Sequence, residues 1–140
     1  MSERKRLLVI DDDPDFVEGI GSILEGADYA VDVAYNPEDG SKALQTDPPD
    51  LLILDIMMGR GAEGIALARK IRKDPELREI PVLIITGIRE KIAFLFPGEP
   101  LHPRFVAVDE LVEKPVEPEF LLERVSALLE AAEARKVQTD

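Results

Sequence analysis

The stretch that decides the fold is Leu-Leu-Val-Ile-Asp-Asp-Asp-Pro, at residues 7–14. Four consecutive aliphatic side chains are typical of a short strand that is covered on both faces, as in a parallel sheet. The strand ends at three aspartates, of which Asp13 suits the N-cap of a helix, and Pro14 suits its first position. Apolar residues then recur at helical spacing as far as Gly26, near which the helix should end. The chain therefore begins with a buried strand, an acidic turn and a helix.

The same alternation continues along the chain. Further strands are predicted at residues 31–34, 51–54 and 82–85, and a fifth lies within residues 106–113. Amphipathic helices separate the first four strands, and a long terminal helix begins near Glu117. This alternation predicts an α/β fold, with a doubly wound five-stranded parallel sheet. The flavodoxin-like strand order 2-1-3-4-5 places the alternating segment 31–34 at an edge and the all-apolar strands inside.

Length and composition indicate one domain. The chain has 140 residues, of which 45% are apolar and 33% are charged, as is typical of a soluble globular domain. We expect the domain to span residues 5–133 and a short C-terminal tail to follow at residues 134–140. Because the chain has no cysteine, disulfides, thiolate metal sites and cysteine nucleophiles are excluded.

The charge balance narrows the choice of partners. The chain has 29 acidic and 17 basic residues, a net charge of −12 and an isoelectric point near 4.5. Such a charge repels phosphate backbones and anionic lipids, so we expect neither nucleic acid nor a membrane as a partner. The longest aliphatic runs have four residues, whereas a membrane helix needs about 20. Residues 1–6 are basic but lead directly into a strand, unlike a signal peptide, so a cytoplasmic location is expected.

Polar side chains stand where the strands are predicted to end. Asp11 and Asp12 follow the first strand, Asp55 the third, Thr86 the fourth and Lys114 the fifth. Because the first and third strands are neighbours in the predicted order, their three carboxylates converge and need a cation or shared protons to offset repulsion. Oxygen ligands at a partly open site suit Mg²⁺. A threonine hydroxyl and a lysine ammonium are suited to hold phosphoryl oxygens.

These acids also have structural interpretations. Taken alone, Asp11 and Asp12 fit the role of solvated turn acids equally well. Asp55 is different, because it is the only charged residue between Asp50 and Arg60 and lies in a strongly apolar setting. Burial of an unpaired carboxylate costs several kcal/mol, so its presence there indicates chemistry or a bound cation.

The chain resembles the receiver domains of two-component response regulators. The matching blocks are Leu-Val-Ile-Asp-Asp-Asp-Pro (8–14), Pro-Asp-Leu-Leu-Ile-Leu-Asp-Ile-Met-Met (49–58), Ile-Pro-Val-Leu-Ile-Ile-Thr-Gly (80–87) and Glu-Lys-Pro (113–115). They occur in the family's order, with near-family spacing, over nearly the whole chain. The resemblance implies a phosphoacceptor domain rather than an enzyme, which receives a phosphoryl group from a histidine kinase or a phosphotransfer protein. A stand-alone domain of this type would pass its signal on by protein–protein contact or act as an intermediate in a phosphorelay.

The resemblance also implies a magnesium site. Asp55 would accept the phosphoryl group as an aspartyl phosphate and would contribute to the metal site. Asp12 would bind Mg²⁺ directly, and Asp11 would bind it through water. Met57 would supply only its backbone carbonyl to the metal.

Two further residues would hold the transferred group. Thr86 and Lys114 would bind the phosphoryl oxygens, and the movement of Thr86 toward them would be the switch. The peptide bond between Lys114 and Pro115 would be cis. Receivers usually have an aromatic residue three positions before this lysine, coupled to the motion of the threonine, whereas this chain has Leu111 there.

Residues 88–105 depart most from the family pattern. Pro97, Pro100 and Pro103 are spaced so that no helix can pass through them. We therefore expect the fourth helix to be shortened or replaced by a proline-rich loop, and we hypothesise that this loop forms an unusual signalling surface. The same irregularity leaves one alternative open, a pseudo-receiver that binds partners without being phosphorylated.

Met57 argues against an enzyme of a different family and also bears on the lifetime of the phosphorylated form. Phosphatases of the haloacid-dehalogenase type also place a nucleophilic aspartate after a buried strand, but they need a second acid two residues later as the general acid. This chain has Met57 there, so the phosphatase interpretation is disfavoured. In receivers, this position and that of Ile88 influence the access of water to the phosphoryl group. Since both side chains are bulky and apolar, slow self-dephosphorylation is expected.

Overall fold

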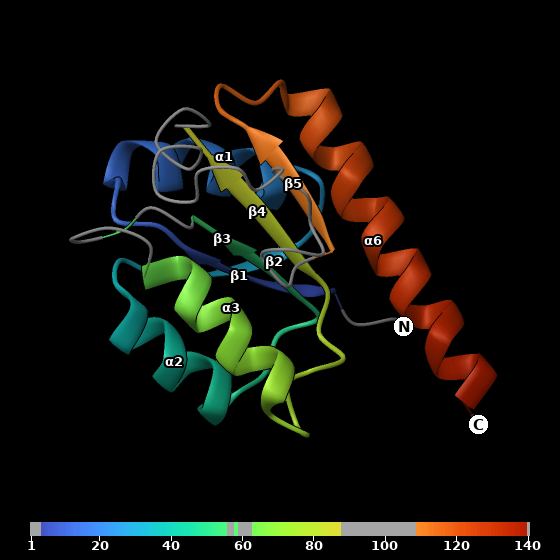
Figure 1. The fold of residues 1–140 in the computed structure, drawn as a ribbon. Helices are drawn as coiled ribbons and strands as arrows, with labels where there is room; N and C mark the ends of the chain where they lie inside the picture. The colour runs from blue at the N-terminus through green and yellow to red at the C-terminus, as the bar shows by residue number, and fades with distance from the viewer. Residues whose placement is uncertain (1–3, 56–57, 59–62, 88–108, 140) are drawn as a thin grey trace, which may run out of the picture.

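A five-stranded parallel sheet forms the centre of the molecule in the computed structural model, which describes residues 4–55, 58, 63–87 and 109–139 (Figure 1). The strand order is β2-β1-β3-β4-β5, which confirms the predicted order with β2 at an edge. The strands are β1 (Arg6–Ile10), β2 (Ala30–Ala34), β3 (Leu51–Leu54), β4 (Val82–Thr86) and β5 (Glu110–Glu113).

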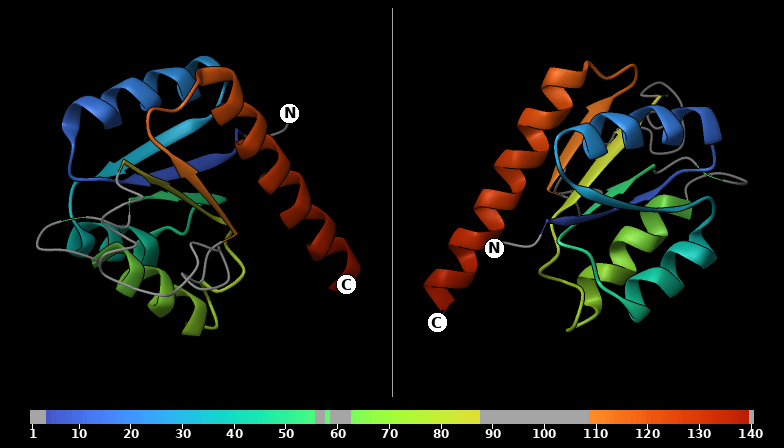
Figure 2. Two further views of the ribbon diagram at one scale, coloured as in Figure 1. Left: turned by 45° about the horizontal axis from the view of Figure 1, so that its top comes forward. Right: turned by 180° about the vertical axis from the view of Figure 1, so that it is seen from behind.

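Helices cover both faces of the sheet (Figures 1 and 2). They are α1 (Pro14–Gly26), α2 (Pro37–Thr46), α3 (Glu63–Lys73) and α6 (Pro118–Thr139). Leu7, Val9 and Leu51 point to one face and pack with α1 and α6, whereas Leu8 and Leu52 point to the other and pack with α2 and α3. Successive side chains of a strand alternate between faces, so a strand between two helical layers must be apolar at every position. This is why the aliphatic tetrads predicted the inner strands.

The helix starts follow the predicted capping. Asp13 accepts hydrogen bonds from the backbone N–H groups of Asp15 and Phe16, and Asn36 accepts one from Asp39. Each cap precedes a proline at the start of its helix, where the missing N–H costs nothing. Capping of this kind also fixes the direction in which the chain leaves the carboxyl end of a strand.

The terminal helix is longer than the sequence predicted. A tail is expected at residues 134–140, but α6 continues to Thr139, so a helix end near residue 133 is wrong. Large apolar residues stop recurring at helical spacing in the last turns of α6, because these turns extend past the sheet (Figure 1) and do not pack on the core. Ionic contacts replace apolar ones there, since Lys5 donates a hydrogen bond to Glu133 at 2.6 Å.

Two expectations lie outside the described residues. One is the shortened fourth helix and signalling surface at residues 88–105, and the other is the influence of Met57 and Ile88 on the access of water to the phosphoryl group. The predicted fifth strand, within residues 106–113, is found at Glu110–Glu113.

Two helix glycines should respond in opposite ways to alanine. A Cβ atom at Gly40 would lie 3.0 Å from Cγ1 of Ile10, which is 0% exposed, and closer still to its Cδ1. A Cβ atom at Gly19 would meet nothing within 4 Å. We expect Gly40→Ala to lower the free energy of unfolding by about 1–3 kcal/mol through overpacking. Gly19→Ala should raise it by about 0.5–1 kcal/mol, because alanine is the better helix former.

Urea unfolding of both variants measures this difference. Equal stabilisation by the two alanines would contradict the close approach of α2 to β1.

Candidate functional site

Asp11 and Asp55 lie level with one another because of the strand register. Ile10 pairs with Leu54 in the parallel ladder of β1 and β3, so the next residue of each strand stands at the same edge. The N–H of Asp55 donates to the carbonyl of Ile10 at 3.0 Å, which extends the ladder to the acids themselves. The N–H of Asp11 likewise donates to the carbonyl of Ala34 at 3.1 Å. The backbone therefore holds both acids rigidly.

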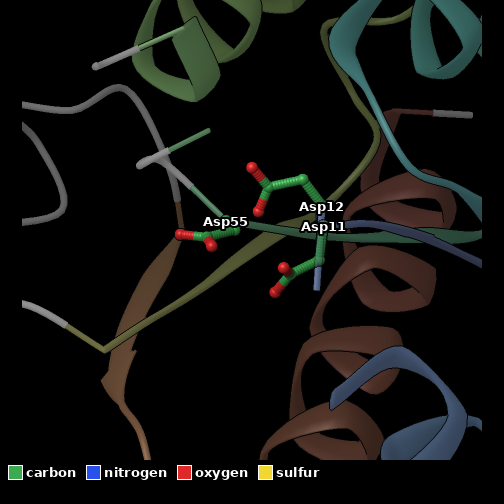
Figure 3. A group of neighbouring side chains, drawn as sticks. All are labelled: Asp11, Asp12 and Asp55. Atoms are coloured by element: carbon green, nitrogen blue, oxygen red, sulfur yellow. The ribbon is translucent and has the colours of Figure 1, made fainter. Parts of the chain in front are cut away.

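Three carboxylates gather at this edge (Figure 3). Asp11 is 2% exposed, Asp55 is 6% exposed and Asp12 is solvent-exposed. One carboxylate oxygen from each lies within 4.8 Å of the others. The Asp11 carboxylate also accepts the N–H of Asp13 at 2.9 Å. Such oxygen-only donors, two buried and one facing water, are what Mg²⁺ requires of a site that also retains water ligands.

Lys114 reaches this cluster from the far side of β4. Thr86 pairs with Glu113 in the ladder of β4 and β5, so Lys114 follows directly at the same edge of the sheet. Its Nζ donates to Oδ2 of Asp11 at 3.0 Å and lies 3.5 Å from Oδ2 of Asp55. The ammonium therefore offsets part of the charge of two buried carboxylates.

The stem of Lys114 crosses the end of β4 beside Gly87. A Cβ atom at Gly87 would lie 3.4 Å from Cδ of Lys114, so a side chain at this position would contact the stem. The peptide bond between Lys114 and Pro115 is cis, as the family resemblance implied.

Four of the six predicted site residues come together in this way. They are Asp11, Asp12, Asp55 and Lys114. Thr86 is the last residue of β4, but its side chain, like the whole of Met57, lies outside what the structure describes. The chemical roles expected of all six remain predictions.

One neighbour of the site was not predicted. Nζ of Lys114 lies 4.0 Å from the centroid of the Phe16 ring. Phe16 lies at helical spacing on the apolar face of α1 and packs against the core cluster that contains Val17 and Ile20. No local pattern could have distinguished it, because its second contact is with a residue far along the chain.

Fold and site together define a class of protein. It is a doubly wound α/β domain that carries a carboxylate cluster and a lysine at the carboxyl ends of its strands, near the switch point of the strand order between β1 and β3. Residues 7–126 match the family model described as the response regulator receiver domain. The chain belongs to this family, the receiver domains of two-component response regulators.

Curated relatives support the same assignment. The chain is 33% identical over 127 residues to the DNA-binding dual master transcriptional regulator RpaA of Synechocystis, covering 89% of this chain and 48% of that protein. It is 30% identical over 125 residues to the phosphate regulon transcriptional regulatory protein PhoB of Pseudomonas aeruginosa, covering 89% and 52%. The chain thus spans about half the length of these relatives.

Two solved structures match over nearly their whole length. A CheY-like response regulator receiver domain protein from Methanospirillum hungatei aligns with a TM-score of 0.80 and 25% identity, covering 94% of this chain and 98% of that one. A response regulator from Chloroflexus aurantiacus aligns with a TM-score of 0.78 and 27% identity, covering 91% and 98%. Within the described part of this chain, no helix has the length and hydropathy needed to cross a bilayer.

Proposed function

We propose that this receiver domain is a phosphoacceptor, in which Asp55 takes a phosphoryl group from the phosphohistidine of a histidine kinase or a phosphotransfer protein. The observation that carries the proposal is the position of Asp55, 6% exposed at the end of β3 and 3.5 Å from the Lys114 ammonium. Burial of a carboxylate beside a cation and two further acids lowers the stability of the fold, because the charged groups lose their hydration. Such an arrangement therefore indicates a chemical role.

The transfer asks more of positioning than of nucleophilic strength. A carboxylate oxygen of Asp55 forms the new bond to phosphorus while the bond from phosphorus to the histidine nitrogen breaks. The transition state is loose and spreads charge over the phosphoryl oxygens. Fixed cations and hydrogen-bond donors therefore provide most of its stabilisation. Lys114 supplies one cation, and the Thr86 hydroxyl would supply a hydrogen bond.

A divalent cation completes the proposed site. Asp12 would bind Mg²⁺ directly and Asp11 through water, with Asp55 and the backbone carbonyl of Met57 as further ligands. When bound, Mg²⁺ offsets the negative charge of the carboxylates and of the phosphoryl oxygens.

The signal would leave the domain by protein–protein contact rather than by catalysis of a further reaction. Ten of the 29 acidic residues lie in residues 7–41, a stretch without lysine, arginine or histidine that covers β1 after Arg6, all of α1 and β2, and the start of α2. A surface of this charge opposes contact with nucleic acid or anionic lipid. RpaA is named as DNA-binding, but this chain matches only about half of that protein, so the absence of a nucleic-acid partner stays part of the proposal.

Mass spectrometry of the intact protein tests the proposal. Incubation with acetyl phosphate and Mg²⁺ should add one phosphoryl group, about 80 Da, and chelation of the metal should prevent the gain. Phosphoramidate and a panel of phosphorylated histidine kinases serve as further donors. If none of these donors adds mass, the domain is a pseudo-receiver that binds partners without phosphorylation.

The phosphorylated form should decay slowly. Bulky apolar residues at Met57 and Ile88 stand where the family controls the access of water, so a half-life of minutes or longer is expected. The decay is followed by intact mass after removal of the donor, and Met57→Asn and Ile88→Glu should accelerate it. A wild-type half-life of seconds that neither substitution shortens would contradict this expectation.

A further inference from the structure

The Lys114 ammonium rests on an aromatic face. Its Nζ lies 4.0 Å from the centroid of the Phe16 ring, well within the distance of about 6 Å at which a cation is attracted to the ring quadrupole. Phe16 is half-buried, so water screens this attraction less than at an exposed site. The contact joins the first turn of α1 to the residue that follows β5.

Phe16 is itself held firmly. Its N–H donates to the side chain of Asp13, the N-cap of α1, at 3.3 Å. Its ring packs on the core cluster that includes Val17 and Ile20 of the same helix. The ring is therefore a fixed platform, whereas the lysine is a flexible chain that needs one.

Three sets of contacts surround the lysine. Asp11 and Asp55 attract the ammonium, the stem occupies the space that a Cβ atom at Gly87 would contact, and the Phe16 ring lies against Nζ. The two acids are not a constant restraint, because both are expected to change their charge partners when metal and phosphoryl group arrive. The ring is neutral and keeps its attraction for the ammonium throughout.

We propose that Phe16 is a positioning residue for phosphoryl transfer, which holds the Lys114 ammonium beside Asp55 through a cation–π contact. The inference rests on the proposed phosphoacceptor function and adds a residue to it. A leucine at position 16 would fill the same apolar space against α1 but would present no negative ring face. Loss of the ring should therefore slow phosphoryl transfer to Asp55 even where leucine restores the packing.

Substitutions at position 16 separate the two roles. We expect Phe16→Leu to slow the gain of phosphate from acetyl phosphate by about fivefold, with Phe16→Tyr close to the wild type. Site-specific 3,4,5-trifluorophenylalanine keeps the shape of the ring and removes most of its negative face, so it should slow the reaction as leucine does. Urea unfolding identifies any variant that fails to fold, and the trifluoro ring keeps the comparison valid if leucine does so.

A double-mutant cycle tests whether Phe16 acts through the lysine. In a Lys114→Ala background, Phe16→Leu should cause no further loss of rate, since there is no ammonium to position. Equal rates for phenylalanine, leucine and the trifluoro ring would overturn the proposal, as would a fivefold loss that persists without Lys114.

A separate measurement distinguishes failure of this inference from failure of the proposed function. The ε-methylene protons of Lys114 should be shifted upfield by the ring current in NMR spectra of the wild type, and the shift should vanish in Phe16→Leu. If the wild type gains no phosphate but the shift is present, the proposed function fails, and with it the role of Phe16 in transfer. If the wild type gains phosphate and the shift is absent, Phe16 does not hold the lysine and this inference alone is wrong.

Discussion

The Asp55→Asn variant should gain no phosphoryl group under conditions in which the wild type gains about 80 Da. The amide has nearly the same size and shape as the carboxylate but lacks the anionic oxygen that forms the bond to phosphorus. The rate should fall by at least about 100-fold. Folding should survive, because removal of one negative charge from a group of three carboxylates relieves repulsion.

Asp50→Asn is the matched control. Asp50 lies immediately before the other end of β3, where its carboxylate accepts the N–H of Arg6 at 2.8 Å, far from the carboxyl edge of the sheet. This variant should gain phosphate at the wild-type rate. Borohydride reduction of the phosphorylated wild type should convert Asp55, and not Asp50, into homoserine, which peptide mapping detects. Phosphate gain by Asp55→Asn at the wild-type rate would assign the acceptor role to another residue.

The Lys114→Met variant should lose about 3 kcal/mol of unfolding free energy when divalent cations are chelated. Methionine keeps an unbranched apolar stem of similar length but removes the ammonium. Asp11 and Asp55 then stay buried, at 2% and 6% exposed, without their 3.0 Å and 3.5 Å partner. Removal of one member of a buried charge group is costly, because the two carboxylates lose the cation that offsets their negative charge. Urea unfolding in the presence of a chelator measures the loss.

Magnesium should restore more stability to Lys114→Met than to the wild type. Binding to the folded state alone raises the unfolding free energy, and the cluster without its ammonium has more negative charge to offset. If Mg²⁺ stabilises the two proteins equally, then Lys114 and the metal do not act on the same carboxylates.

Lys5→Met is the control for burial. Lys5 and Glu133 are closer, at 2.6 Å, but their side chains are 40% and 51% exposed. Their hydrogen bond raises the pKa of Lys5 and lowers the pKa of Glu133, yet both groups are well solvated when separated. The variant should unfold almost as the wild type does. If Lys5→Met lost as much unfolding free energy as Lys114→Met, then the distance between the charges, and not their burial, would determine how much each ion pair stabilises the fold.

Much of the fold could be predicted because its signals are local. The tetrad Leu51–Leu54 matches β3 from end to end, since a strand covered on both faces must be apolar throughout. Asp13 and Asn36 mark helix starts because a cap is formed within three residues of its own position. The end of α6 could not be predicted from such local signals. Its last turns do not pack on the core, so large apolar residues do not recur at helical spacing in their sequence.

By itself, the sequence determined the types and order of the elements, the edge position of β2 and the set of acids at the strand ends. These follow from hydrophobic period, capping and strand composition, each of which is set by a few neighbouring residues. Only the tertiary structure decided the contact of Lys114 with Asp11, 103 positions away, and the place of Phe16 against that lysine. Such contacts depend on strand register and on the direction of side chains, which are fixed only when the helices pack against the assembled sheet.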